Sequence, residues 1–534
     1  MRERKTLYQF GYRRSPDQDR ASPARRPVVV VGAGPVGLCA AIDLAQRGVP
    51  VLLLDDADRI GEGSRGICYA KRTLEILDRL GVAQKCLRKG VTWKIGKVFQ
   101  HDVLLYSFDL LPEDGHEMPA FLNLQQYYLE HYLVERAAEL DRLEIRWRNK
   151  VVALARRDDG AMLTVETPEG PYEVEGEWVI AADGARSSLR DLLGLAFRGE
   201  AFEDRFLIAD VTMRGDFPSE RWFWFDPPFH EGRSALLHKQ PDDVWRIDLQ
   251  LGPEADAEHE QRPERVVPRL KHMLGHDDFA LEWVSLYTFQ CRRLERFVHG
   301  RVVFVGDSAH QVSPFGARGA NSGIQDAENL AWKLARVLTG EAAEALVDTY
   351  DRERSAAADE NIGHSTRSTD FIAPRSAQEL RFRNAALSLA RTTGFGKRMV
   401  NSGRLSTASV YDTPLSTPDQ DSWSDSARLG APVPDAPLVD RAGKPVWLLE
   451  ALGGEATMLH VKNGPGPPAL PGLRRVVIGE DFGDPDGLLA RRLDATPGAT
   501  YLVRPDQHLA ARWRASDGDA VQRALRRSRA EVRA

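Results

Sequence analysis

The sequence predicts an α/β protein in three parts: a domain opened by a βαβ unit, an antiparallel sheet inserted in it, and a separate α/β domain at the C-terminal end. A βαβ pattern with a glycine-rich turn begins at Val28, period-two alternation runs from about 206 to 290, and new strand and helix patterns follow residue 442. A chain of 534 residues has room for several domains. We expect these divisions: 1–26 as a polar N-terminal arm, 27–195 and 296–372 as the discontinuous first domain, 196–295 as the inserted sheet domain, 373–442 as a helical segment and linker, and 443–534 as the last domain.

Composition excludes several classes of protein. Apolar residues make up 42% of the chain and charged residues 28%, so a disordered chain is not expected. The 72 basic residues are balanced by 78 acidic ones, unlike the concentrated basic surface of a nucleic-acid-binding protein. The longest apolar run, 27–42, contains three glycines and is too short for a membrane span. Four cysteines without CxxC spacing, and no secretory signal in the first 26 residues, predict a cytoplasmic protein with reduced thiols. We expect no nucleic-acid partner, no membrane partner and no metal site.

The first motif is the βαβ unit itself. A buried strand at 28–31 leads into the turn 32–37, a helix follows at 38–47, and a second strand at 51–54 ends at Asp55. Glycines alone recur in many turns, but this complete order predicts dinucleotide binding.

Each residue of this motif has an expected task. Gly32 makes the tight turn, Gly34 lets the backbone approach a pyrophosphate, and Gly37 lets the helix pack closely on the strand. The phosphates then lie at the helix N-terminus, where free amides favour negative charge. Asp55 is placed to accept hydrogen bonds from both hydroxyls of a ribose.

Two further motifs follow apolar strands. Asp183 begins the stretch 183–190 directly after a strand at 178–182, and alone this is equally well a helix turn capped by aspartate. The third motif runs from a strand that ends at Gly306-Asp307, through a glycine-rich loop, to a helix that begins near Asn321. Asp307 is suited to hold a chain of hydroxyls. His310 is either a base or, as we favour, a loop residue that supports the turn.

The inserted sheet has a polar face on one of its strands. Arg246, Asp248 and Gln250 alternate with Trp245, Ile247 and Leu249, so they share a face. This face either lies over a substrate or is a solvated outer face. In the last domain we expect strands at 457–461, 475–478 and 501–503 and helices at 487–493 and 520–527.

Taken together, the three motifs resemble the flavin fingerprints of the class A flavoprotein monooxygenases, the para-hydroxybenzoate hydroxylase-type family, over roughly 27–372. Residues 63–72 (GSRGICYAKR) and 123–126 (NLQQ) look most similar to the 3-(3-hydroxyphenyl)propionate hydroxylase-like branch. The C-terminal segment resembles the thioredoxin-like domain of phenol-hydroxylase relatives. It contains no cysteine, so a redox role is excluded and a structural or interaction role is expected.

The resemblance implies FAD as the bound cofactor, NADH or NADPH as a transient co-substrate, and O2. Residues expected at the adenosine and phosphate end of FAD are Gly32, Gly34, Pro35, Val36, Gly37 and Asp55. Arg65 is expected to meet either the FAD phosphates or the moving flavin, and Asp183 to help hold FAD and the docking pyridine nucleotide. Residues expected near the ribityl chain and the isoalloxazine are Gln126 (or Gln125), Gly306, Asp307, Pro314, Gly316, Arg318, Gly319, Ala320 and Asn321. Many relatives have Gly-Gln where this chain has Ala317-Arg318. The arginine either stabilises the anionic reduced flavin or is a solvated side chain.

The implied reaction is hydroxylation of a phenolic aromatic substrate through a flavin hydroperoxide, with water excluded from the site. Arg246, Tyr287, His238 and Pro314 are the candidates for the substrate side of the site, although each also has an ordinary packing interpretation.

Two alternatives stay open: a monooxygenase that tailors a polyketide or polycyclic aromatic, and an uncoupled flavin-binding NAD(P)H oxidase or sensor. A halogenase is disfavoured, because Asp226 stands in Trp222–Pro227 where the halogenase motif has isoleucine. A homodimer is the family tendency.

Overall fold

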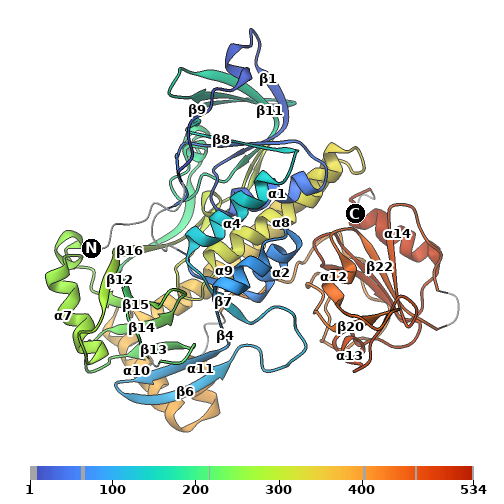
Figure 1. Cartoon of the computed structure of the whole chain (residues 1–534). Helices are drawn as coiled ribbons and strands as arrows, with labels where there is room; N and C mark the ends of the chain where they lie inside the picture. The colour runs from blue at the N-terminus through green and yellow to red at the C-terminus, as the bar shows by residue number, and fades with distance from the viewer. Residues whose placement is uncertain (1–8, 62–65, 216, 401–404, 464–465, 532–534) are drawn as a thin grey trace.

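The computed structural model describes residues 9–61, 66–215, 217–400, 405–463 and 466–531. It is a mixed α/β structure with three large sheets and one small one (Figure 1). The multi-sheet α/β class predicted from the sequence is confirmed.

The central sheet is built around β1 (Ala24–Val31), which pairs in parallel with β2 (Val51–Asp55) and β11 (Tyr172–Ala181). Its remaining strands are β8 (Leu143–Trp147), β9 (Lys150–Arg157), β10 (Gly160–Glu166), β17 (Val298–His299) and β18 (Val302–Phe304). The helices that pack in the same core are α1 (Pro35–Gln46), α4 (Gln126–Ala138) and α8 (Gly319–Leu338). A parallel strand covered by helices has no solvated side, which explains the unbroken valine run 28–31.

The N-terminal segment is packed against the central sheet from residue 9 onward. It contains a short 3-10 helix, Pro16–Asp19, and β1 begins at Ala24, inside the arm expected at 1–26. Asp17 is buried, and its Oδ2 accepts hydrogen bonds from Arg26 at 2.7 Å and Arg146 at 2.6 Å. Polar composition predicted an arm here, but these ion pairs fasten the described part of it to the sheet.

The second sheet carries the period-two strands. Its long members are β12 (Phe197–Thr212), β15 (Val244–Leu251) and β16 (Ala280–Leu294), followed by β13 (Arg221–Phe225), β14 (Ser234–Lys239) and β19 (His310–Gln311). β5 (Ile95–Gln100) and β6 (Val103–Asp109) complete it, with β5 parallel to β13. These two strands come from the range that we assigned to the first domain. A hairpin signal is local, whereas its pairing with a strand more than a hundred residues away has no sequence signature.

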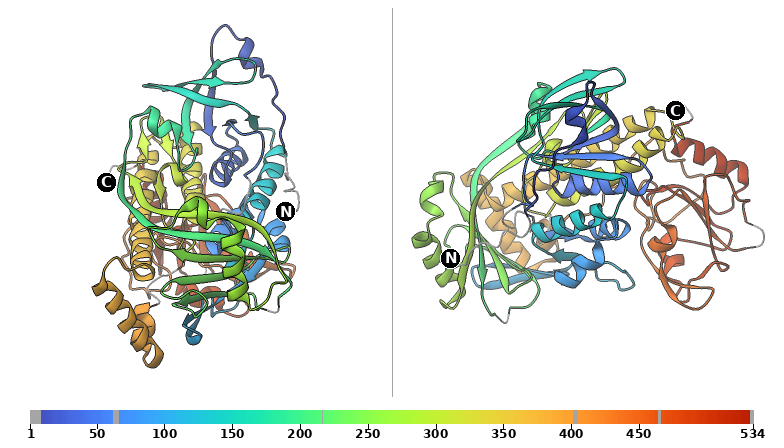
Figure 2. Two further views of the ribbon diagram at one scale, coloured as in Figure 1. Left: turned by 90° about the vertical axis from the view of Figure 1, so that its left-hand side faces the viewer. Right: turned by 45° about the horizontal axis from the view of Figure 1, so that its top comes forward.

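Helices cover this sheet on both sides. The outer face packs against α7 (Pro263–Leu274), which follows the short α6 (Ala257–Glu260). The inner face shares a cluster with α9 (Ala345–Ile372), α10 (Ala377–Thr392) and α11 (Gly394–Val400). Figure 1 shows β6 at the lower edge beside α10 and α11, and Figure 2 shows the green strands of the sheet from two other directions.

A small sheet and short helices complete the region between the large sheets. The sheet pairs β3 (Cys68–Ala70) and β4 (Val91–Trp93) with β7 (Phe121–Asn123). The helices are α2 (Lys71–Arg79), α3 (Ala83–Lys89) and α5 (Ser188–Leu192).

The C-terminal domain has its own sheet and core. Its strand order is β21-β20-β24-β23-β22-β25-β26, with bounds Pro437–Asp440 (β20), Pro445–Trp447 (β21), Thr457–Val461 (β22), Arg474–Ile478 (β23), Phe482–Gly483 (β24), Thr500–Val503 (β25) and Leu509–Trp513 (β26). Its helices are α12 (Leu448–Leu452), α13 (Leu488–Leu493) and α14 (Gly518–Ser528). The strands and helices expected here are confirmed to within two residues; the likeness to a thioredoxin domain stays a prediction.

None of the helices described by the structure is long and apolar enough to cross a membrane.

Candidate functional site

The glycine turn leaves space where a diphosphate is expected. Gly32 has φ +107°, and a Cβ there would collide with the carbonyl of Ala182, while a Cβ on Gly37 would collide with the carbonyl of Gly32. A Cβ on Gly34 would meet nothing within 4 Å. Gly34 is also the N-cap of α1, so no side chain caps the first backbone amides of this helix. Pro35 has no amide hydrogen, and the amide of Val36 is therefore the first that faces this open space. The turn therefore fits a phosphate group.

Asp55 lies beside the turn at the end of β2. Its Oδ2 accepts a hydrogen bond from the Ala33 amide at 2.5 Å, and its Oδ1 accepts one from the Ala57 amide at 2.8 Å. Burial raises the pKa of Asp55. The carboxylate thus holds the glycine turn in place, in addition to the ribose role expected from the sequence.

Gly61 and Gly66 are both hydrogen-bonded to side chains of α4. Gln126 Oε1 accepts a hydrogen bond from the Gly66 amide at 3.0 Å, and Glu130 Oε2 accepts one from the Gly61 amide at 2.7 Å. Gln125 instead points away, with its Nε2 donating to the Pro241 carbonyl at 3.2 Å. The structure thus places Gln126 at Gly66 and Gln125 at Pro241. Arg65 lies outside the described residues.

Asp183 follows β11, next to the glycine turn. Its Oδ2 accepts hydrogen bonds from the Leu189 amide at 3.0 Å and the Ser188 hydroxyl at 3.3 Å. Its Oδ1 is buried without a hydrogen-bond partner among the described residues, and burial raises its pKa. This buried oxygen can still accept a hydrogen bond, and it lies beside the glycine turn. The arrangement fits a bound dinucleotide that donates a hydrogen bond to Asp183.

Asp307 lies at the other side of the site, directly after Gly306, which has φ +61°. The Asp307 side chain is exposed, yet desolvation by the surrounding protein raises its pKa. Both facts place the carboxylate in a recess of the protein that solvent reaches. Such a position suits an acceptor for the hydroxyls of a ribityl chain.

Replacing Asp307 with alanine is expected to weaken FAD binding by about ten- to a hundredfold, because hydrogen bonds to a charged acceptor are lost. The apoprotein should not lose melting temperature, because the raised pKa of Asp307 shows that the charged carboxylate does not stabilise the folded chain. Titration of the apoprotein with FAD measures the effect. Unchanged FAD affinity would contradict the assignment.

The loop 314–321 is fixed by buried polar contacts. Asn321 Oδ1 accepts a hydrogen bond from the Ala70 amide at 2.8 Å, and its Nδ2 donates to the carbonyls of Cys68 and Ala317. Ala317 has φ +52°, a conformation that glycine adopts more easily. Gly319 and Ala320 form the first turn of α8, and Pro314 is exposed.

Arg318 is buried, which contradicts the solvated alternative. Its Nη1 donates to Asn361 Oδ1 at 2.8 Å, and burial lowers its pKa to about 10.

His310 is also buried, and its Nε2 lies 2.7 Å from Asp326 Oδ2. The favoured interpretation of His310, as a residue that supports the turn, agrees with this contact.

The polar face of β15 is an inner face. Arg246 and Gln250 are buried, whereas Trp245 and its apolar neighbours pack under α7. The solvated outer face that the sequence allowed is therefore wrong, because the sequence did not show that helices cover both sides of the sheet. Trp222 and Trp224 lie on the α7 side as packing residues.

The substrate candidates on this face differ in what they contact. Arg246 is an ion-pair partner of buried Asp210, with Nε–Oδ1 2.9 Å and Nη2–Oδ2 3.2 Å. His238 is buried, and burial, then Arg221 and Arg246, lower its pKa well below the ordinary value, so it is neutral. Tyr287 is half-buried in an apolar cluster. Because Arg246 already forms an ion pair with Asp210, it is not well placed to bind an anionic group of the substrate.

A cavity of about 100 Å³, partly open to solvent, lies on the same face. Aromatic side chains dominate its lining: Tyr106, Phe108, Phe223, Phe225, Phe315 and Phe371. Phe315 and Gly316 belong to the third motif, so the cavity borders the loop expected at the isoalloxazine. The sequence identified that loop but not the cavity, because β5 and β6 supply part of its wall.

Arg221 is the cavity residue that sequence reasoning missed. It is half-buried, has no ion pair within the described part of the chain, and burial lowers its pKa. Its position directly before the Trp222–Phe225 run was visible in the sequence, but the alternation alone did not distinguish it from a surface arginine.

Asp248 lies on the polar face of β15 that the sequence analysis considered for the substrate, although it was not named there as an individual candidate. Its Oδ1 is buried without a hydrogen-bond partner among the described residues, and burial raises its pKa to about 6, against the opposing effect of Arg246. Since the folded chain holds this proton more tightly than the unfolded chain, Asp248 lowers stability as the pH rises from about 4 to 6.

We expect Asp248→Asn to raise the free energy of unfolding at pH 7 by at most about 3 kcal/mol, with no gain at pH 4. The reason is that the amide carries no charge to desolvate. Urea unfolding at both pH values checks this, and an equal gain at pH 4 and pH 7 would show that the carboxylate titration is not the cause.

The comparisons with known proteins agree with this site. The FAD binding domain family matches residues 25–365. The 6-methylpretetramide 4-monooxygenase of Streptomyces rimosus is 32% identical over 521 residues, which are 92% of this chain and 91% of that protein. A 3-(3-hydroxy-phenyl)propionate/3-hydroxycinnamic acid hydroxylase of Mycolicibacterium smegmatis is 28% identical over 381 residues, 71% of this chain and 67% of that protein. The crystal structure of the flavin-dependent monooxygenase PieE with FAD and substrate has the same fold, with TM-score 0.82 and 23% identity over 96% of this chain and 100% of that chain.

The fold, the three motifs and these relatives define a flavoprotein monooxygenase that uses FAD, NAD(P)H and O2. More specifically, the chain belongs to the FAD binding domain family, and the predicted resemblance to the class A aromatic hydroxylases is confirmed.

Proposed function

We propose that this chain hydroxylates a phenolic ring of a polycyclic aromatic substrate bound in the cavity beside Phe315. The observation that carries the proposal is the aromatic lining of a cavity that reaches the third flavin motif. The relative that matches nearly the whole chain is named for action on 6-methylpretetramide, which supports the same choice.

The groups proposed to hold FAD are those whose geometry fits it. The open turn at Gly34, the unpartnered Oδ1 of Asp183 and the exposed carboxylate of Asp307 hold the phosphates and hydroxyls. When bound, FAD accepts a hydride from NAD(P)H and activates O2 for transfer of one oxygen atom. Arg318, buried at the N-terminus of α8, supplies positive charge near the flavin-binding loop.

The groups proposed to act on the substrate lie on the inner face of the second sheet. Arg221 stabilises the phenolate in the cavity, because a half-buried guanidinium that forms no ion pair within the described residues favours an anion. Asp248 Oδ1 accepts the phenol proton, since a pKa of about 6 keeps it ionised at neutral pH. The six aromatic side chains of the cavity hold the ring system and exclude water.

Isotope incorporation tests this function. The FAD-loaded protein is incubated with NADH or NADPH, ¹⁸O2 and a panel of polycyclic phenols and single-ring phenolic acids, and products are analysed by mass spectrometry. One labelled oxygen in a polycyclic product is the expected result. Label only in single-ring products would overturn the substrate class, and NAD(P)H consumption that yields only H2O2 with every compound would favour the uncoupled oxidase.

A homodimer, a cytoplasmic location and the thioredoxin-like character of 443–534 stay predictions from the sequence.

A further inference from the structure

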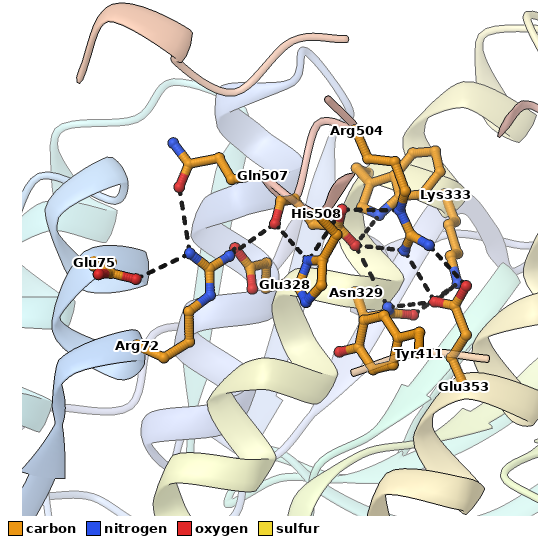
Figure 3. Close-up of polar contacts among 12 residues, drawn as sticks. Arg72, Glu75, Glu328, Asn329, Lys333, Glu353, Tyr411, Arg504, Gln507 and His508 are labelled. Carbon is orange, nitrogen blue, oxygen red and sulfur yellow. Dashed lines mark hydrogen bonds and ion pairs between the residues drawn. The ribbon is translucent and has the colours of Figure 1, made fainter. Parts of the chain in front are cut away.

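The turn between β25 and β26 carries charged side chains out of the C-terminal domain and into the FAD-binding domain. Arg504 donates to both carboxylate oxygens of Glu353 on α9, at 2.8 and 2.9 Å. It also pairs with Asp506 at 2.6 Å, and Asp506 Oδ2 accepts a hydrogen bond from the Trp332 indole on α8 at 3.0 Å. All four residues are buried. Figure 3 shows this group of polar contacts between the two domains.

A second contact of the same turn runs through Tyr411, which precedes the C-terminal domain in the chain. The Tyr411 ring stacks on His508, with centroids 4.5 Å apart. Its hydroxyl accepts a hydrogen bond from Arg354 Nη1 at 2.9 Å. Arg354 is fully buried in α9, adjacent to Glu353. The C-terminal turn therefore meets α9 at two consecutive residues.

Arg354 connects this contact to the loops expected to hold FAD. Its Nε donates to Asp326 Oδ1 at 2.6 Å, and Asp326 Oδ2 accepts a hydrogen bond from the Gly306 amide at 2.9 Å. Asp326 also contacts His310 at 2.7 Å. Gly306 directly precedes Asp307, so this series of buried contacts ends next to the residue that is proposed to bind the ribityl chain of FAD.

A branch from Arg354 reaches the other flavin loop. Arg354 Nη2 donates to Ser322 Oγ at 3.0 Å, and Asn361 Nδ2 donates to the same hydroxyl at 3.2 Å. Asn361 Oδ1 in turn accepts a hydrogen bond from Arg318 at 2.8 Å. These residues are all buried. Both flavin loops are thus attached to one guanidinium.

We propose that Arg354 is a positioning residue for FAD and that the C-terminal domain, through Tyr411 and His508, holds Arg354 in place. The inference rests on the assignment of FAD to this site. The cysteine-free domain then has a task in the enzyme: it stabilises the conformation of the two flavin loops that is competent to bind the cofactor. A protein whose competent conformation is less populated binds its ligand more weakly in proportion.

Tyr411→Phe tests the proposal with a minimal change. It removes the hydroxyl that Arg354 contacts and keeps the ring that stacks on His508. We expect the dissociation constant of FAD to rise about three- to tenfold, because a buried donor loses its acceptor. We also expect the absorption bands of the bound flavin to shift, which a general loss of stability does not cause. The matched control is Tyr501→Phe, since Tyr501 is buried in the same domain and donates to the Leu493 carbonyl at 3.0 Å, with no described contact to Arg354.

The control should lower the melting temperature but leave FAD affinity within twofold and the flavin spectrum unchanged. Ser322→Ala is the second variant, because it interrupts the branch toward Arg318 without touching the C-terminal domain. It should weaken FAD binding as well. The proposal is overturned if Tyr411→Phe and Ser322→Ala both bind FAD within twofold of the wild type, or if Tyr501→Phe weakens binding as much as they do. A wild-type chain that binds no FAD would instead overturn the cofactor assignment itself.

Discussion

Replacing Gly34 with alanine is expected to raise the dissociation constant of FAD at least about a hundredfold, while the apoprotein stays as stable as the wild type. A Cβ at this position meets no protein atom within 4 Å, and the backbone has φ −72°, which alanine adopts without strain. The methyl group therefore costs nothing until the pyrophosphate approaches the backbone, where only glycine leaves room. Apoprotein titration with FAD and a melting curve of the apoprotein measure the two halves of the prediction.

Gly11→Ala is the control for Gly34→Ala, since a Cβ on Gly11 also meets nothing within 4 Å and Gly11 lies outside the motif. It should change neither FAD affinity nor stability. Gly37→Ala should differ from both, because its Cβ collides with the backbone of Gly32 and the apoprotein itself is destabilised. If Gly34→Ala bound FAD normally, the diphosphate would have to lie elsewhere.

Arg221→Met is expected to lower kcat/KM for the hydroxylated substrate about ten- to a hundredfold, with no loss of stability. The guanidinium lines the cavity and forms no ion pair within the described residues, and the nearby carboxylate of Asp248 keeps the larger electrostatic effect of Arg246 when Arg221 is removed. The lost interaction with a phenolate accounts for the kinetic effect. Steady-state kinetics and urea unfolding of the same preparation test both parts.

Arg246→Met is the matched comparison on the same face of the sheet. It leaves buried Asp210 without its ion-pair partner, so we expect a loss of about 3–5 kcal/mol in the free energy of unfolding. The two arginines thus separate a substrate role from a structural one. Equal stability losses in both variants would contradict the assignment of Arg221.

Local pattern predicted most of the FAD-binding half of the site. The valine run, the three glycines and Asp55 lie where the βαβ order placed them, because strand, turn and helix are adjacent in the chain. Asn321 also lies at the start of α8 as expected, although its role in tying Ala70 and Cys68 to the loop has no local signal.

The substrate half was not predictable to the same extent. Whether the face of Arg246 is inner or outer depends on which helices cover the sheet, and two-residue alternation is the same in both cases. Arg354 and Tyr411 are 57 residues apart in the chain, and their contact follows from the docking of the C-terminal domain. Long-range contacts of this kind leave no mark in a single sequence.

The origin of β5 and β6 has a consequence for protein engineering. Lys97, Val98, Tyr106 and Phe108 line the aromatic cavity proposed for the substrate, yet they precede the rest of the second sheet in the chain by more than eighty residues. A chimaera that exchanges only residues 196–295 with a relative would combine cavity residues from two parents, and it would leave β13 paired with a foreign β5. The unit that transfers substrate preference between such enzymes is therefore discontinuous, and it includes residues 95–109 together with the inserted sheet.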